Sequence, residues 1–300
     1  MNTNRSSRLP LLKSILLFMG ASFFAFLLSV ALHETGHYLA SIILGVPERG
    51  IVLNHFGQNY NIYLGDLDVA LGTTGRHAFG GASGMLFDLF ITLTVSLLLW
   101  RKRSPALLPL LLLGSYALLH ESVSMIMEVI EYPNACDGCW SDWVSVMRFG
   151  VPPGVVALLA AVMLAAGCIW LLQLLPLTGI TAQDAFWRRL VVLMTGIPLL
   201  FLCAVIYQTL FGVDYYVPAW RGWLLMESVR KSKIIYTAAS AGLTAIITPL
   251  HRPLFPWLDR LSHTPAAQVR WRDVLVAIGL AVVIIAVQWV LFNDPTIKVR

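Results

Sequence analysis

Seven apolar runs in the chain are each long enough to cross a lipid bilayer as a helix. A helix rises about 1.5 Å per residue, so about 20 apolar residues cross the hydrocarbon core. Backbone groups find no water to bond with in lipid, so each run is expected to be helical. Charged residues make up only 12% of the chain, against roughly 25% in soluble domains. The approximate runs are 11–44, 79–100, 105–127, 152–175, 190–211, 233–250 and 273–292.

These runs predict an all-α polytopic membrane protein with about seven transmembrane helices. The connections are mostly short and show no internal repeat, so residues 1–300 are expected to form a single membrane domain. We predict a multi-pass integral membrane protein, with the cell membrane as the favoured location. Between the first and second runs, the segment 51–65 alternates apolar and polar residues enough to predict a short β-hairpin-like element.

Lys and Arg lie beside the apolar runs, singly or in groups of three, as at 101–103. The formal net charge of +5 therefore reflects membrane topology and contact with lipid headgroups, and nucleic-acid binding is not predicted. The run order places 12 of the 21 basic residues on the N-terminal side, which slightly favours a cytosolic N-terminus.

Two histidines and a glutamate stand at the C-terminal end of the first run, in the sequence HETGH. On a helix, His33 and His37 lie on one face, and each can present a ring nitrogen to the same ion. In this H-E-x-x-H arrangement zinc lowers the pKa of its bound water, and the glutamate accepts the proton as water attacks a carbonyl. Ionisable groups within a span are costly and usually mark a functional site. The sequence therefore predicts a Zn²⁺ site with ligands His33 and His37 and catalytic residue Glu34, for amide hydrolysis.

Catalytic zinc normally has three protein ligands, so a third is expected elsewhere in the chain. The second run crosses away from the HETGH side and the third run returns. The stretch 128–151 therefore shares the side of the two histidines, and it contains the acidic residues Glu128, Glu131, Asp137 and Asp142.

HETGH together with this acidic stretch resembles the site-2 protease family, over about residues 20–165. These are intramembrane zinc metalloproteases that pair an HExxH helix with an aspartate at the start of a later helix. The stretch AFGGASGMLFDLF is similar to the family's Gly-rich helix start, with Ala82 in place of the usual proline and Asp88 near the asparagine's place. The family also has a strand near its active site, so segment 51–65 could hold an extended substrate by strand addition.

The resemblance implies a zinc metalloendopeptidase that cleaves a transmembrane protein substrate in or near its spanning segment. Its protease-like core would occupy about 11–175, with additional helices at 176–300. Of two aspartates that match the family's patterns, we favour Asp142, since Ser141 could cap the apolar helix that follows. Asp137, in the turn-rich CDGC, is the alternative third ligand. The family places its catalytic end near the cytosol, opposite to the orientation that the basic residues favour.

Further polar residues could support the site. His120 and Glu128 share one helical face on the motif side, where they could orient the ligands as a second shell or line a water path. Asp88 could contact the substrate or orient a metal ligand, but we favour a buried carboxylate that bonds a neighbouring helix. Gly36 would leave room for a substrate strand, and Gly80 and Gly84, four residues apart, predict close helix approach.

Two other functional classes fit parts of the same pattern. An inactive relative would bind or escort membrane proteins without cleaving them. A transporter would use the intramembrane His, Glu and Asp residues as an ion or proton path, although the chain lacks two related halves with paired broken helices. The sequence indicates no oligomeric state.

Overall fold

The computed structural model describes residues 8–46, 49–52, 60–63, 73–134, 142–211, 222–262 and 267–292. The α-helices in this part of the chain are α1 (Arg8–Ile43), α3 (Thr74–Leu99), α4 (Leu108–Glu131), α5 (Asp142–Arg148), α6 (Pro153–Leu174), α7 (Phe186–Met194), α8 (Ile197–Phe211), α9 (Gly222–Ser262) and α10 (Trp271–Phe292). Short 3₁₀ segments at Trp100–Lys102, Pro105–Leu107, Tyr132–Asn134 and Leu175–Thr178 extend or join several of these helices.

Six of the described helices are long and apolar enough to cross a membrane, and a bent pair could supply a seventh span. The six are α1, α3, α4, α6, α9 and α10, close to the predicted runs. The fifth run, predicted as one helix, is instead the pair α7 and α8, with a bend of 48° between them. Pro198 at the start of α8 lacks a backbone N–H, which favours a helix break at this point.

Strands β1 (Arg49–Val52) and β2 (Tyr60–Tyr63) form a two-stranded antiparallel sheet, with Arg49 opposite Tyr63 and Val52 opposite Tyr60. The sheet lies between α1 and α3 in the chain, where the sequence predicted a hairpin-like element, and it packs against α1.

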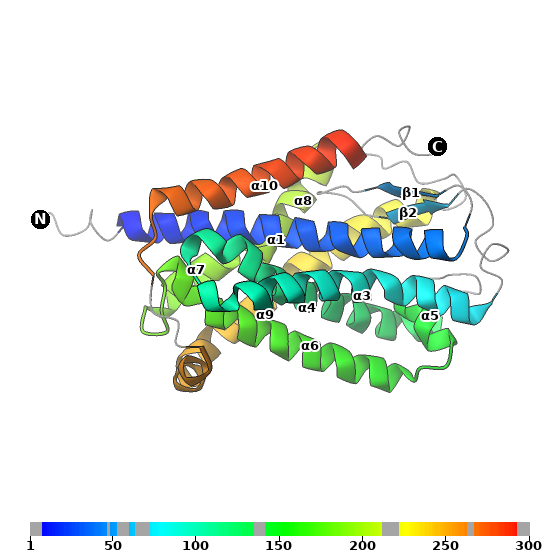
Figure 1. Ribbon diagram of the computed structural model, residues 1–300, viewed down its shortest axis with the longest axis horizontal. Coiled ribbons are helices and arrows are strands. Elements are labelled where there is room, and N and C mark those ends of the chain that lie inside the picture. The colour runs from blue at the N-terminus through cyan, green and yellow to red at the C-terminus, as the bar shows by residue number, and fades with distance from the viewer. Residues whose placement is uncertain are drawn as a thin grey trace, which may run out of the picture.

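Helix α1 runs the length of the bundle and contacts most of the other elements (Figure 1). Helices α3, α4 and α10 pack along it, and α6 packs on the far side of α4. The C-terminal end of α1, the start of α3, the end of α4 and helix α5 meet at one end of the bundle. The histidine pair of α1 therefore faces elements that lie 40 to 110 residues later in the chain.

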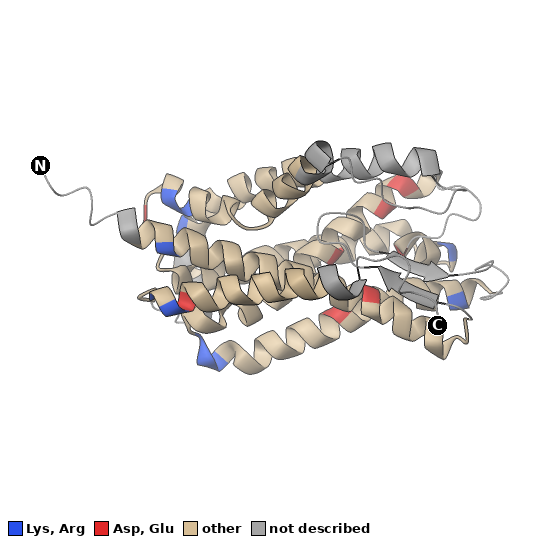
Figure 2. Cartoon of the chain, turned by 90° about the horizontal axis from the view of Figure 1, so that it is seen from above, with Lys and Arg blue, Asp and Glu red and all other residues tan. Residues whose placement is uncertain are grey.

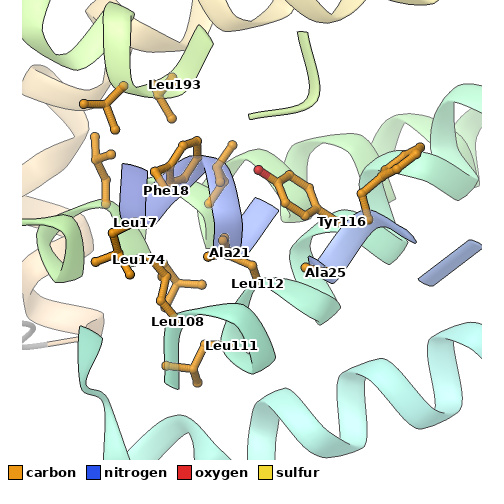
Figure 3. Packing of buried hydrophobic residues seen from close by; sticks show 14 of the residues in the cluster. Leu17, Phe18, Ala21, Ala25, Leu108, Leu111, Leu112, Tyr116, Leu174 and Leu193 are labelled. Atoms are coloured by element: carbon orange, nitrogen blue, oxygen red, sulfur yellow. The ribbon is translucent and has the colours of Figure 1, made fainter. Parts of the chain in front are cut away.

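The larger of two apolar clusters packs around the first half of α1 (Figure 3), and a smaller one that includes Met125, Trp143 and Val156 joins α4, α5 and α6. Lipid tails are as apolar as these side chains, so helix association in a membrane depends on close packing and hydrogen bonds. One such bond crosses the core: the Tyr116 hydroxyl donates to Ser22 Oγ at 2.6 Å. The labelled core residues come from several helices and include Leu17, Phe18, Leu112, Leu174 and Leu193.

Figure 2 shows that most of the Lys and Arg residues it colours lie at the end of the bundle where the chain begins. Asp and Glu are fewer and lie at both ends of the bundle.

Gly20 gives the first test of this packing. A Cβ at Gly20 would lie 2.9 Å from the backbone of Ala277 and Ile278, whereas one at Gly279 on α10 would meet nothing within 4 Å. We expect Gly20→Ala to lower the free energy of unfolding by about 1–3 kcal/mol through overpacking. Gly279→Ala is the matched control and should not lower it. Unfolding of the purified protein in detergent measures both, and equal stability of the two variants would contradict the α1–α10 contact.

Candidate metal centre

His33, His37 and Asp142 come together at the end of the bundle where α1, α3 and α5 meet. The two Nε2 atoms of His33 and His37 are 2.9 Å apart. Asp142 Oδ2 lies 3.0 Å from His33 Nε2, and its Oδ1 lies 3.2 Å from His37 Nε2. One ligand atom from each residue thus lies close to the other two, in a group that could hold a metal ion.

The outer ring nitrogen of each histidine has its own partner. His37 Nδ1 lies 2.7 Å from the Gly80 carbonyl, which can only accept, so His37 carries a hydrogen on Nδ1. His33 Nδ1 lies 2.6 Å from Oε1 of Glu121, a carboxylate with no solvent exposure. These contacts orient both rings and place a hydrogen on each Nδ1, so that in the neutral form each Nε2 carries a lone pair.

Three lone-pair atoms therefore converge on one point: the Nε2 atoms of His33 and His37 and an oxygen of Asp142. Acceptors at such distances repel each other unless a proton or a metal ion lies between them. In tetrahedral zinc sites with bonds of 2.0–2.2 Å, neighbouring ligand atoms are about 3.3 to 3.6 Å apart, a few tenths of an ångström more than the 2.9–3.2 Å found here. Two imidazoles and one carboxylate are a common donor set for catalytic zinc, so these residues fit the ion.

Two glycines of α3 make room for this convergence. A Cβ at Gly84 would lie 2.4 Å from His37 Nε2 and 2.9 Å from His33 Nε2, so only glycine leaves the ligand atoms free. A Cβ at Gly81 would lie 2.3 Å from the Asp142 carbonyl oxygen. A hydrogen side chain at both positions therefore lets α1 and α5 approach the same face of α3.

Gly36 has a different role from the predicted one. A Cβ at Gly36 would lie 2.5 Å from the Ser83 carbonyl oxygen and 2.9 Å from Gly84 Cα. The space beside Gly36 is thus filled by α3, and the prediction that it admits a substrate strand is wrong. The predicted close approach holds at Gly84 but not at Gly80, whose Cβ would meet nothing within 4 Å.

Asp142 is the first residue of α5, and its side chain is 28% exposed. Desolvation by burial raises the pKa of this carboxyl group, but the positive charges of His37 and His33 in their protonated forms outweigh it and hold the pKa well below the usual range. A metal cation in place of those protons would have the same effect, so Asp142 is an anion in either case.

Glu34 is buried on α1 beside the ligand pair. It directly follows His33, so its carboxyl group leaves the helix about 100° from the face that carries the two histidines. From there it could exchange a proton with a water molecule at the centre.

The centre lies well inside the spanning helices. His33 is ten residues before the end of α1, Gly84 is ten residues after the start of α3, and Glu121 is ten residues before the end of α4. At about 1.5 Å per residue, each helix places the centre about 15 Å below its end, roughly half the thickness of a hydrocarbon core.

The remaining predicted residues contact the centre less directly. The His120 ring packs edge-on against the His33 ring, with centroids 5.5 Å apart. Glu128 accepts hydrogen bonds from the backbone of α5. Asp88 accepts a hydrogen bond from Ser29 at 2.7 Å, so it joins α3 to α1 as the alternative prediction proposed. Asp137 and Ser141 lie outside the described residues.

Sequence reasoning missed Glu121, the closest carboxylate partner of a predicted ligand. The prediction considered only the helical face shared by His120 and Glu128. Glu121 points about 100° away from His120 on the same helix, so it was not on that face. An acidic residue within an apolar run was itself the signal that could have identified it. The Gly80 carbonyl that orients His37 has no side-chain signal at all. No family model, curated protein or solved structure matches this chain.

The glycine beneath the ligands can be tested with a matched pair on α3. We expect Gly84→Ala to weaken zinc binding at least about tenfold, because the new methyl group overlaps the space of His37 Nε2. Gly80→Ala should bind zinc as the wild type does, since its Cβ meets nothing. Zinc titration against a chromophoric chelator measures both, and equal affinities for the two variants would disprove the arrangement.

A second pair of variants tests which aspartate is the third zinc ligand. Asp142→Ala should lower zinc affinity about 100-fold or more, because one of three donors is removed. Asp137→Ala should keep the wild-type affinity. The reverse order of effects, measured by the same titration, would assign the ligand to Asp137.

Proposed function

We propose that this protein is an intramembrane zinc metalloprotease that hydrolyses a peptide bond in or near a transmembrane segment of another membrane protein. The observation that carries the proposal is the convergence of His33, His37 and Asp142 next to Glu34, with both histidines held in the form that exposes Nε2. The HExxH spacing and the fit of the donor set to zinc support the same chemistry.

In this proposal His33, His37 and Asp142 hold the ion. Bound zinc would lower the pKa of a water ligand and polarise the carbonyl of the scissile peptide. Glu34 accepts a proton from the attacking water as the new C–O bond forms. It then delivers that proton to the leaving nitrogen as the C–N bond breaks. Burial of Glu34 suits this role, because few water molecules compete for its carboxylate.

The depth of the site supports a membrane protein as the substrate. A centre about 15 Å below the helix ends is reached more readily by a segment that is itself in the bilayer than by a soluble chain. A helical substrate hides its carbonyls in its own hydrogen bonds, so it must unwind before cleavage. The strands β1 and β2 pack against α1. They could hold the unwound segment by pairing with it as a further strand.

Glu34→Gln separates catalysis from binding. It should lower cleavage by about 10²- to 10⁴-fold, because the amide cannot accept the proton, while zinc content stays at the wild-type level. His33→Ala should lose both cleavage and zinc. Cells that express each variant can be compared by mass spectrometry of new protein N-termini in membrane proteins, together with metal analysis of the purified chains.

The same comparison distinguishes the rival functions. Equal cleavage products in wild type and Glu34→Gln would refute the protease. If Glu34→Gln retained full biological function without cleavage, the chain would act as a binding or escort protein. Zinc- or proton-coupled flux across liposomes that contain the purified chain would favour a transporter.

A further inference from the structure

Two carboxylates of α4 support the candidate metal centre although neither is one of its three ligands. Glu121 and Glu128 are seven residues apart, so both lie on one side of the helix. Glu121 contacts His33, and Glu128 contacts the backbone of α5, the helix that begins with Asp142. We propose that Glu121 and Glu128 are positioning residues through which α4 sets the metal affinity of the centre; this inference rests on the proposed zinc site.

Glu121 acts on the His33 ring. Its Oε1 accepts the Nδ1–H of His33 at 2.6 Å, and with 0% exposure it has no competing water. A carboxylate in this position fixes the ring and its tautomer and makes the opposite nitrogen a better donor to a metal. His33 Nε2 is thereby aimed at the point shared with His37 and Asp142.

A second metal ion between His33, His120 and Glu121 is the alternative, because their ligand atoms also form a compact group. The distances decide against it. Two ligand atoms on one tetrahedral zinc ion are about 3.3 to 3.6 Å apart, whereas His33 Nδ1 and Glu121 Oε1 are 2.6 Å apart, the length of a strong charge-assisted hydrogen bond.

Glu128 acts on Asp142 through the backbone. Its Oε2 accepts the N–H groups of Trp143 at 2.7 Å and Val144 at 3.1 Å. Helix α5 has only seven residues, too few to be stable alone, and its first N–H groups have no partners within the helix. Glu128 thus fixes the start of α5 to α4, while Gly81 of α3 closes on Asp142 from another side.

Isosteric substitutions in the full-length chain test the proposal. We expect Glu121→Gln and Glu128→Gln each to weaken zinc binding about 10- to 100-fold, the usual effect of losing a group that orients a ligand. Glu131→Gln, at the exposed end of the same helix, is the control and should bind as the wild type does. The charge-conserving Glu121→Asp and Glu128→Asp should lose less affinity than the glutamines, and they remain informative if a glutamine variant does not fold.

A double-mutant cycle separates positioning from a general loss of structure. In an Asp142→Ala background, Glu128→Gln should cost no further affinity, because its effect passes through Asp142. Glu121→Gln should still weaken binding there, since it acts on His33. Visible absorption of bound Co²⁺ gives a second readout: Glu121→Gln should shift the bands, and Glu131→Gln should not.

The outcomes distinguish this inference from the function it rests on. A wild-type chain that binds no zinc would refute the metal site and the positioning role together. A wild-type chain that binds zinc, with both glutamine variants binding equally tightly, would refute the positioning role alone. An undiminished loss from Glu128→Gln in the Asp142→Ala background would also overturn it, because the effect would then be a general structural one.

Discussion

The convergence of three acceptor atoms within a membrane-spanning bundle is the constraint on which the rest of the structure depends. The Nε2 atoms of His33 and His37 are 2.9 Å apart, and Asp142 lies 3.0–3.2 Å from both. Charges and lone pairs in such a place are costly unless a cation binds them. The Gly80 carbonyl and Glu121 keep the two rings in the orientation that maintains this arrangement.

Each of the surrounding helices contributes different groups to the centre. Helix α1 supplies the histidine pair and Glu34, α5 supplies Asp142, and α3 supplies glycines in place of side chains that would overlap the ligands. Helix α4 supplies none of the three ligands, but its carboxylates contact His33 and the start of α5. Close packing of this kind, more than burial of apolar surface, is what stabilises helix contacts in lipid.

The sequence predicted the spans well because length and hydropathy are local properties. It did not predict the break between α7 and α8, since the apolar run continues through Gly196 and Pro198. There a Cβ at Gly196 would lie 2.9 Å from Phe18 and Tyr116, contacts from distant parts of the chain. The prediction for Gly36 was wrong because its neighbours, Ser83 and Gly84, belong to another helix. The sequence around Gly36 does not show that α3 fills the space beside it.

The sequence by itself determined that the chain is a membrane protein, and that His33, Glu34 and His37 fall on one stretch of a spanning helix. Spacing along one helix is enough for that, because the helical repeat fixes which side chains share a face. Only the tertiary structure decided which acidic residue meets the pair, and that Glu121 rather than His120 bonds His33. These contacts depend on how separate helices are rotated and how closely they approach each other. Glycines on α3 permit the close approach, and no local sequence pattern predicts it.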